Sequence, residues 1–214
     1  MMCGNASRCI GKYLYEKVFR MPQEWKDREV ILELEGVYPS AEVLLNGKKA
    51  GTCRYGYSGY YVPLCHINAA EENVLAVEVD ASRQPDSRWY SGSGIYRPVW
   101  IWTGNKTHIK PDGIRITTLS TEPAVVSVEV SVENAENRNP GIRSIILQNG
   151  RIVAEGKGNK TEISIPDAKL WSAEHPDLYE CRIILEENNE VLDEQTVSFG
   201  IRRISWSTKG LFIN

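Results

Sequence analysis

The sequence predicts an all-β protein made of two successive sandwiches, a jelly roll followed by an immunoglobulin-like domain. Short runs with strand-like patterns recur along the chain, Asn-Gly dipeptides separate some of them, and no stretch has the apolar period of a long helix. The length of 214 residues suits two domains of about a hundred residues each, because each could then bury its own core. Strands and turns at this spacing favour a sandwich or jelly roll.

The predicted strands of the first half alternate apolar and polar residues or are rich in β-branched and aromatic residues. Val30, Leu32 and Leu34 predict a strand with one face toward a core. Asn46-Gly47 predicts a type I′ hairpin turn, because both central residues of that turn need positive φ. The predicted strands of this half cover residues 13–19, 30–35, 41–45, 48–53, 73–79 and 99–102.

Residues 86–102, DSRWYSGSGIYRPVWIW, are the most unusual stretch of the chain. Four aromatic residues flank a Ser-Gly-Ser-Gly turn, and Gly92 and Gly94 allow positive φ or close backbone approach. Such a turn beside a strand of bulky residues indicates a shaped surface that could face a planar or sugar-like ligand. A glycine-rich corner filled by core aromatic rings explains the same residues, and both interpretations stay open.

The second half repeats the strand pattern after a polar connection at residues 104–112. We expect the second domain to begin near Ile109 or Ile114. Valines alternate with polar residues from Val126 to Val132, which predicts a half-buried strand. About seven strands without a helix are typical of an immunoglobulin-like domain. The further predicted strands cover residues 142–147, 151–155, 161–165, 179–185 and 190–199, with turns at Asn149-Gly150 and Asn188-Asn189.

Composition and charge exclude several classes of partner. A net charge of −3 provides no basic surface for nucleic acid or an anionic membrane, and no apolar run reaches the length of a membrane-spanning helix. The first residues lack the apolar segment of a secretory signal, so we expect a cytoplasmic location. The five cysteines are odd in number and scattered, which indicates reduced thiols, although Cys3 and Cys9 are close enough in sequence to pair if oxidised. No Cys or His spacing fits a metal site, and no cofactor is expected.

Residues 88–102, RWYSGSGIYRPVWIW, resemble the signature of the sugar-binding domain of glycoside hydrolase family two, which holds β-galactosidases, β-glucuronidases and β-mannosidases. Ser93-Gly94-Ile95-Tyr96-Arg97 is the core of this resemblance, and this version looks most like bacterial β-galactosidases. Further stretches that resemble the family, in its order, are residues 35–38, 43–48, 56–60, 170–179, 199–203 and 210–214.

This resemblance implies a sugar-binding jelly roll at residues 1–108, an immunoglobulin-like sandwich at 109–205, and the start of a connection to a catalytic (β/α)₈ barrel at 206–214. Family members carry some tens of residues before the strand resembled by residues 13–19, so we expect an incomplete first sandwich. Both glutamates that catalyse retaining hydrolysis lie on barrel strands in the family. The resemblance therefore assigns no catalytic residue here, and we expect the isolated chain to be inactive.

The resemblance also places a sugar-contacting rim loop near residues 86–89. Asp86 is expected to accept hydrogen bonds from sugar hydroxyls, Arg88 to donate them, and Trp89 to stack on an apolar sugar face. The alternative is that Arg88 is a cation facing solvent and that the ring of Trp89 belongs to the core. Arg97 is predicted to be structural, a buried guanidinium bonded to loop carbonyls.

A catalytic site within the chain itself is not favoured. The nearest carboxylate pairs are Glu71-Glu72, Glu186-Glu187 and Glu33/Glu35; neighbours on a strand point to opposite faces, and Glu33 and Glu35 are predicted to be solvated. Gly92-Ser93-Gly94 lacks the framing of a nucleophile elbow.

Two functions stay open at this stage. The chain is either the non-catalytic amino-terminal part of a β-glycosidase or a free-standing carbohydrate-binding or adhesive module. An unrelated immunoglobulin-like protein would not explain the ordered set of motifs. The expected partners are a carbohydrate and the catalytic barrel, and self-association through a bare surface also stays open.

Overall fold

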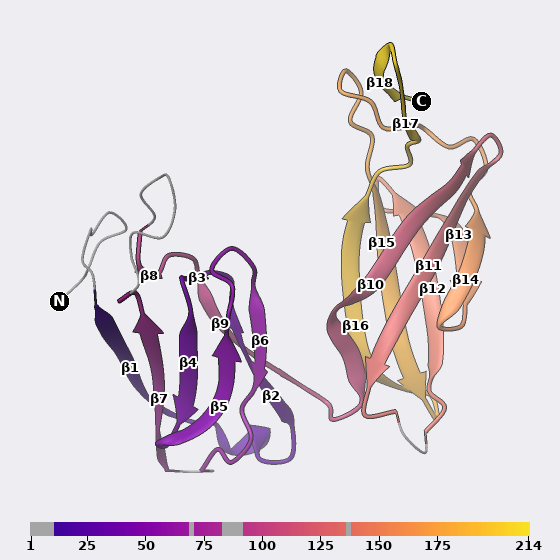
Figure 1. Ribbon diagram of the computed structural model, residues 1–214. Helices are drawn as coiled ribbons and strands as arrows, with labels where there is room; N and C mark the ends of the chain where they lie inside the picture. The colour runs from indigo at the N-terminus through magenta and orange to yellow at the C-terminus, as the bar shows by residue number, and fades with distance from the viewer. Residues whose placement is uncertain (1–10, 69–70, 83–91, 136–137) are drawn as a thin grey trace. The chain divides into compact units, whose positions relative to one another are not determined.

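The computed structural model describes residues 11–68, 71–82, 92–135 and 138–214. Contacts divide the chain between Gly104 and Asn105 into two compact units, both built from antiparallel strands (Figure 1). Among the described residues there is no α-helix, and the single 3-10 turn is Gln23–Trp25. The predicted all-β fold class is confirmed.

The first unit consists of two main sheets and a short strand pair. One sheet has the order β1-β7-β4-β5, the other has the order β6-β2-β9, and β3 pairs with β8. The strands are β1 (Lys12–Arg20), β2 (Glu29–Leu34), β3 (Val37–Tyr38), β4 (Ala41–Leu45), β5 (Lys48–Cys53), β6 (Tyr60–Pro63), β7 (Glu72–Asp80), β8 (Gly94–Ile95) and β9 (Val99–Gly104).

The core of the first unit lies where the inner faces of these sheets meet. Leu32 and Leu34 of β2 and Val43 of β4 have no exposed surface, as their alternation predicts. Ile31 alternates with these residues and so lies on the opposite face of β2, yet it is also buried. The register places it between Pro63 and Trp102, so large neighbours flank it on the outer side.

The dipeptide turns form as predicted. Asn46 and Gly47 have φ of 51° and 75°, and Asn149 and Gly150 have φ of 50° and 75°. Asn46 also uses its side chain: Nδ2 donates to Asn73 Oδ1 at 2.9 Å, and Oδ1 accepts from Val74 N at 2.9 Å. The β4–β5 turn is thereby tied to β7, the neighbouring strand.

The second unit pairs a three-stranded sheet with a four-stranded sheet. Their orders are β10-β11-β14 and β13-β12-β15-β16, and a separate hairpin is formed by β17 and β18. The strands are β10 (His108–Thr121), β11 (Ala124–Glu133), β12 (Gly141–Gln148), β13 (Arg151–Lys157), β14 (Lys160–Ser164), β15 (Tyr179–Glu187), β16 (Glu190–Phe199), β17 (Ile204–Ser207) and β18 (Gly210–Ile213).

The predicted polar connection at residues 104–112 is only partly irregular. β10 begins at His108 and continues through Asp112, where φ is 54°, and its pairing with β11 shifts between Ile109 and Ile114. A strand can absorb such an irregularity and resume its pairing. Residues 105–107 thus form the connection as predicted, whereas residues 108–112 belong to the first part of β10, where the predicted connection was wrong.

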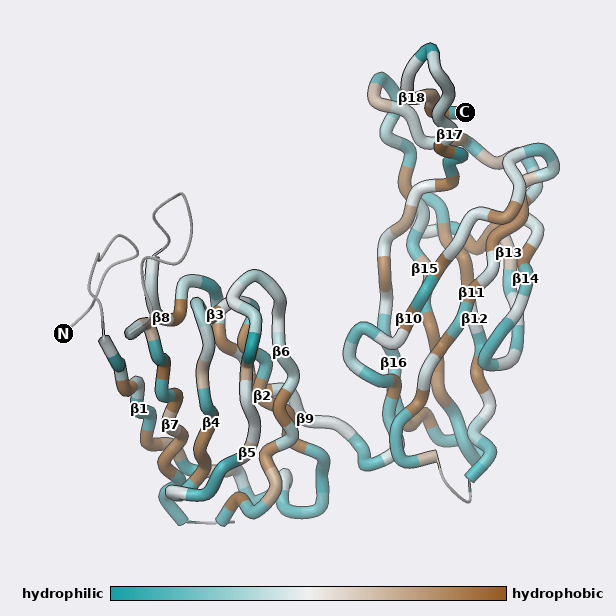
Figure 2. Tube along the Cα trace, viewed as in Figure 1, coloured by the Kyte–Doolittle hydropathy of each residue, from teal (hydrophilic) through white to brown (hydrophobic). Residues whose placement is uncertain are grey.

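The core of the second unit confirms the valine alternation. Val126 and Val128 face Ile146, Ile183 and similar residues of the opposite sheet, all with no exposed surface. In Figure 2 the brown, apolar segments concentrate on the strands of both units, and teal segments are common in the connections.

Two of the motif stretches in the second unit meet in space. Trp171 N donates to Ile201 O at 2.9 Å, and a Cβ on Gly200 would lie 2.9 Å from Trp171 Cβ. The Arg202 guanidinium stands 4.9 Å from the centre of the Trp171 ring. These contacts fix the chain just before the β17–β18 hairpin.

Candidate functional site

The three predicted sugar-contacting residues, Asp86, Arg88 and Trp89, lie outside the described residues. The described chain reaches Ser82 and resumes at Gly92. The assignments to these three residues stay predictions.

Three glycine-containing loops interlock at one end of the first unit, where β3, β8 and the β5–β6 loop lie together (Figure 1). The Tyr96 hydroxyl donates to Gly56 O at 2.7 Å, and a Cβ on Gly36 would lie 2.6 Å from Tyr96 Cζ. Gly94 has φ of 102°, and a Cβ there would overlap the Tyr15 hydroxyl. Glycine is required because rings occupy the space of a side chain.

Exposed tyrosines cover the same end. Tyr57 contacts Tyr38 and Tyr55, with ring centres 5.2 Å and 5.7 Å apart. Tyr55 and Tyr57 are 61% and 51% exposed, whereas Tyr38 is buried. The Tyr60 hydroxyl accepts from Arg54 N and donates to Tyr55 O, both at 3.0 Å, which holds the loop. The end of the unit therefore combines a ring-filled corner with an exposed aromatic surface.

Arg97 differs from its prediction. The residue is exposed, and its guanidinium stands 5.6 Å from the centre of the Tyr96 ring. The prediction of a buried guanidinium was wrong, because the hydroxyl of Tyr96 makes the bond to a loop carbonyl that we had given to Arg97. The motif alone did not show which of two adjacent polar groups turns inward.

Two carboxylates of the first unit hold exposed tryptophans. Trp102 Nε1 donates to Glu33 Oε2 at 2.6 Å, and Trp100 Nε1 donates to Glu35 Oε1 at 2.7 Å. Glu33 and Glu35 are half-buried, so they are less solvated than predicted. Their indole partners are 65 and 69 residues away in the sequence, which is why no local pattern indicated them.

A cavity of about 420 Å³ on the sheet β1-β7-β4-β5 is lined by three further carboxylates, Glu42, Glu78 and Asp80, and Asp80 pairs with Lys12 at 3.7 Å. Glu42 and Glu78 are direct partners across β4 and β7. Glu42 forms an ion pair with Lys49, and Glu78 is exposed. The acid of a retaining pair depends on burial to keep its proton near neutral pH. These solvated carboxylates therefore do not form a glycosidase pair.

A larger cavity of about 750 Å³ lies in the second unit. Arg138, Arg143, Lys157 and Glu186 line it, and Glu186 is the sole carboxylate among its described lining residues. One carboxylate cannot supply both an acid and a nucleophile. Of the other sequence candidates, Glu72 pairs with Arg20 at 3.2 Å, Glu187 pairs with Arg138 at 3.3 Å, and Glu71 is exposed.

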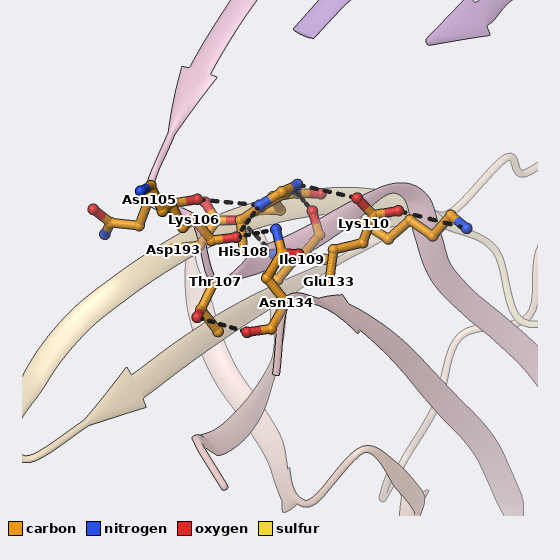
Figure 3. A network of polar contacts seen from close by, with 10 residues as sticks. Asn105, Lys106, Thr107, His108, Ile109, Lys110, Glu133, Asn134 and Asp193 are labelled. Carbon is orange, nitrogen blue, oxygen red and sulfur yellow. Dashed lines mark hydrogen bonds and ion pairs between the residues drawn. The ribbon is translucent and has the colours of Figure 1, made fainter. Parts of the chain in front are cut away.

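A polar network occupies the beginning of β10 (Figure 3). His108 Nδ1 lies 3.1 Å from Asn105 O and 3.0 Å from Lys106 O, and both are acceptors, so Nδ1 carries the hydrogen. His108 Nε2 lies 3.7 Å from Glu133 Oε2, and Lys110 Nζ lies 3.6 Å from Glu133 Oε1. The ring is buried and faces protein atoms on both sides. This arrangement is structural, because it orders the first residues of the unit.

Within the part of the chain that the structure covers, no three His, Cys, Asp or Glu residues are grouped so as to hold a metal ion. In the same part, no helix has the length and apolar character needed to cross a bilayer.

Two family models match the chain side by side. Residues 7–108 match the glycosyl hydrolase 2 galactose-binding domain-like model, and residues 107–202 match the model of glycosyl hydrolases family 2. The chain belongs to glycosyl hydrolase family 2. The resemblance inferred from the motifs is thus confirmed, as is the assignment of a galactose-binding-like sandwich followed by a second sandwich.

Similar members of the family carry two activities in their names. A putative β-glucuronidase of Formosa agariphila is 31% identical over 94% of this chain and 20% of its own length. A β-galactosidase of Bacteroides ovatus is 32% identical over 94% of this chain and 26% of its own length. The crystal structure of a β-glycosidase from Bacteroides vulgatus matches with a TM-score of 0.85 and 29% identity, over the whole chain and 30% of that protein. The chain thus spans about a quarter of the relatives it matches.

Proposed function

We propose that this chain is the non-catalytic, two-sandwich part of a retaining β-glycosidase of the β-galactosidase or β-glucuronidase type. In the whole protein it would support the hydrolysis of O-glycosidic bonds by a catalytic barrel. The observation that carries this proposal is the match of two adjacent family models, in order, to residues 7–202. The relatives named for these activities match over 94% of the chain.

The site chemistry agrees with this division of roles. Retaining hydrolysis needs two carboxyl groups about 5 Å apart, one of which is protonated. The carboxylates weighed above as candidates are bound by indoles, paired with cations or solvated. We therefore assign the acid and the nucleophile to residues outside these 214, and the rim contacts to Asp86, Arg88 and Trp89.

The β17–β18 hairpin supports the proposal of an adjoining catalytic domain. The register places Ile204 opposite Ile213 and Trp206 opposite Leu211, so these four apolar side chains share one face. Trp206 is 81% exposed and Leu211 is 67% exposed. An exposed apolar face of this kind is typical of a surface that another protein element covers.

Hydrolysis by the purified chain tests the proposal. With 4-nitrophenyl β-galactoside and 4-nitrophenyl β-glucuronide, we expect release of nitrophenol at the rate without protein. Turnover above that rate, lost on substitution of Glu42 or Glu78 by Gln, would place the chemistry in this chain and contradict the proposal.

The coding frame beyond the codon for Asn214 provides a second test. We expect it to continue into alternating strand and helix patterns that contain the barrel glutamates. A stop codon at that position would favour the free-standing carbohydrate-binding module instead.

A further inference from the structure

The outer face of the sheet β6-β2-β9 carries two tryptophans that lean in the same direction. Trp100 lies opposite Glu33 in the register and Trp102 lies opposite Ile31. Each indole donates to the glutamate two residues further along the neighbouring chain, Trp100 to Glu35 and Trp102 to Glu33. The same offset in both pairs gives the two rings the same tilt across the sheet.

The rings form a fixed, half-exposed surface. Trp100 and Trp102 are 51% and 55% exposed, as expected for an aromatic ring with one covered face and one face in solvent. Same-face residues on a strand repeat about every 6.7 Å, so the two rings follow one another as a short strip. The bonds to the carboxylates restrict ring rotation, so a ligand that stacks there loses little side-chain entropy on binding.

From this geometry we propose that Trp100, Trp102, Glu33 and Glu35, named here the tryptophan strip, bind a neutral oligosaccharide. One face of a pyranose ring is rich in C–H groups and packs on an indole, while the hydroxyls point outward at its rim. An ionised carboxylate has about four acceptor sites, of which each indole uses one. The two glutamates can therefore accept charge-assisted hydrogen bonds from sugar hydroxyls beside each stacked ring.

The charges of the strip select the class of ligand. Glu33 and Glu35 would repel the carboxylate of a uronate or the sulfate of a sulfated sugar. An apolar protein surface would bury both carboxylates without giving them donors, which is costly. A hydroxyl-rich, uncharged glycan satisfies the rings and the carboxylates together. This binding does not rest on the proposed hydrolytic function.

Affinity electrophoresis of the whole chain tests the proposal. Native gels would contain galactan, xylan or glucomannan as neutral polysaccharides, or polygalacturonate as a uronate polymer. We expect at least one neutral polysaccharide to retard the chain and polygalacturonate to leave it unretarded. Trp100→Ala and Trp102→Ala should each raise the dissociation constant about tenfold, the effect of losing one aromatic contact. The matched control is Trp206→Ala, which removes an exposed tryptophan from β17 and should bind like the parent.

A charge-neutral variant separates stacking from electrostatics. Glu33→Gln combined with Glu35→Gln keeps an acceptor oxygen for each indole and removes both charges. We expect the dissociation constant for the neutral polysaccharide to rise by no more than about tenfold, because amide oxygens accept weaker hydrogen bonds than carboxylates while both rings still stack. Polygalacturonate should begin to retard the chain, because the repulsion is lost. Continued exclusion of polygalacturonate would refute the selection by charge.

Other outcomes overturn the site itself. The proposal is wrong if none of the three neutral polysaccharides retards the chain. It is also wrong if a folded variant that lacks both tryptophans is retarded as much as the parent. Near-ultraviolet circular dichroism of the variants verifies their fold. The nitrophenyl glycoside assays are read separately, so failure of glycan binding leaves the proposed function standing.

Discussion

Replacement of Gly94 by Ala should destabilise the first unit for two separable reasons. The residue has φ of 102°, which costs a residue with a side chain about 1–2 kcal/mol. A Cβ at this position would also overlap the Tyr15 hydroxyl, and relief of such an overlap costs about 1–3 kcal/mol. The sum is about 3 kcal/mol, which corresponds to roughly 12–24 °C in the melting temperature of a domain of this size.

Two other glycines provide matched controls for this experiment. Gly47 has φ of 75° but open space around it, so Gly47→Ala should show the backbone cost of about 1–2 kcal/mol alone. Gly104 also has open space and no positive φ in the left-handed region, so Gly104→Ala should be neutral or stabilise by about 0.5 kcal/mol.

Tyr15→Phe supplies the other half of a double-mutant cycle. It removes the overlapping hydroxyl and leaves ring Cζ at 3.2 Å from the new Cβ, so Gly94→Ala should then cost close to what Gly47→Ala costs. Differential scanning calorimetry measures the change in melting temperature of each unit, because each unit can melt separately. Only the transition of the first unit should move. Equal costs of Gly94→Ala with and without Tyr15→Phe would refute the close approach of Tyr15 to Gly94.

Three further predictions concern other parts of the chain. Arg182 donates hydrogen bonds to both carboxylate oxygens of Glu194 and lowers the pKa of Glu194 below its usual 4.5. The stability that this pair contributes is therefore full above pH 4.5 and is lost as the pH falls through the lowered pKa. Glu194→Gln should flatten the decline of the melting temperature between about pH 5 and pH 3. Burial raises the pKa of Cys181 to about 12. Iodoacetamide at about pH 8 should therefore label the exposed Cys65 in the native chain and label Cys181 only after unfolding. Peptide mass spectrometry would detect both modifications. His108→Ala should lower the stability of the second unit by about 1–2 kcal/mol, because two backbone carbonyls lose their shared donor. An unchanged melting temperature of the second unit in calorimetry would contradict this.

Local chemistry explains why most strands could be predicted. The strands of residues 41–45 and 48–53 are β4 and β5 to the residue, because Asn46-Gly47 fixes the turn between them. Alternation from Val126 to Val132 likewise placed β11. These features depend on neighbours within a few residues, which the sequence displays directly.

Parts of the candidate site depended on long-range pairing instead. The sequence showed that Tyr96 and Arg97 are adjacent polar groups, and only the fold decided that Tyr96 turns inward to reach Gly56. It also suggested solvated Glu33 and Glu35, whereas the structure gives each an indole donor. No period or spacing encodes which residues face each other across strands distant in sequence.

The sequence by itself determined the family, the all-β class and the two successive sandwiches, because motif order and alternation are written along the chain. Tertiary structure decided which side chains share a face, as in the pairing of β2 with β9 that assembles Trp100 and Trp102 beside Glu33 and Glu35. The physical reason is that register is set by the packing of whole sheets, which balances many weak contacts at once.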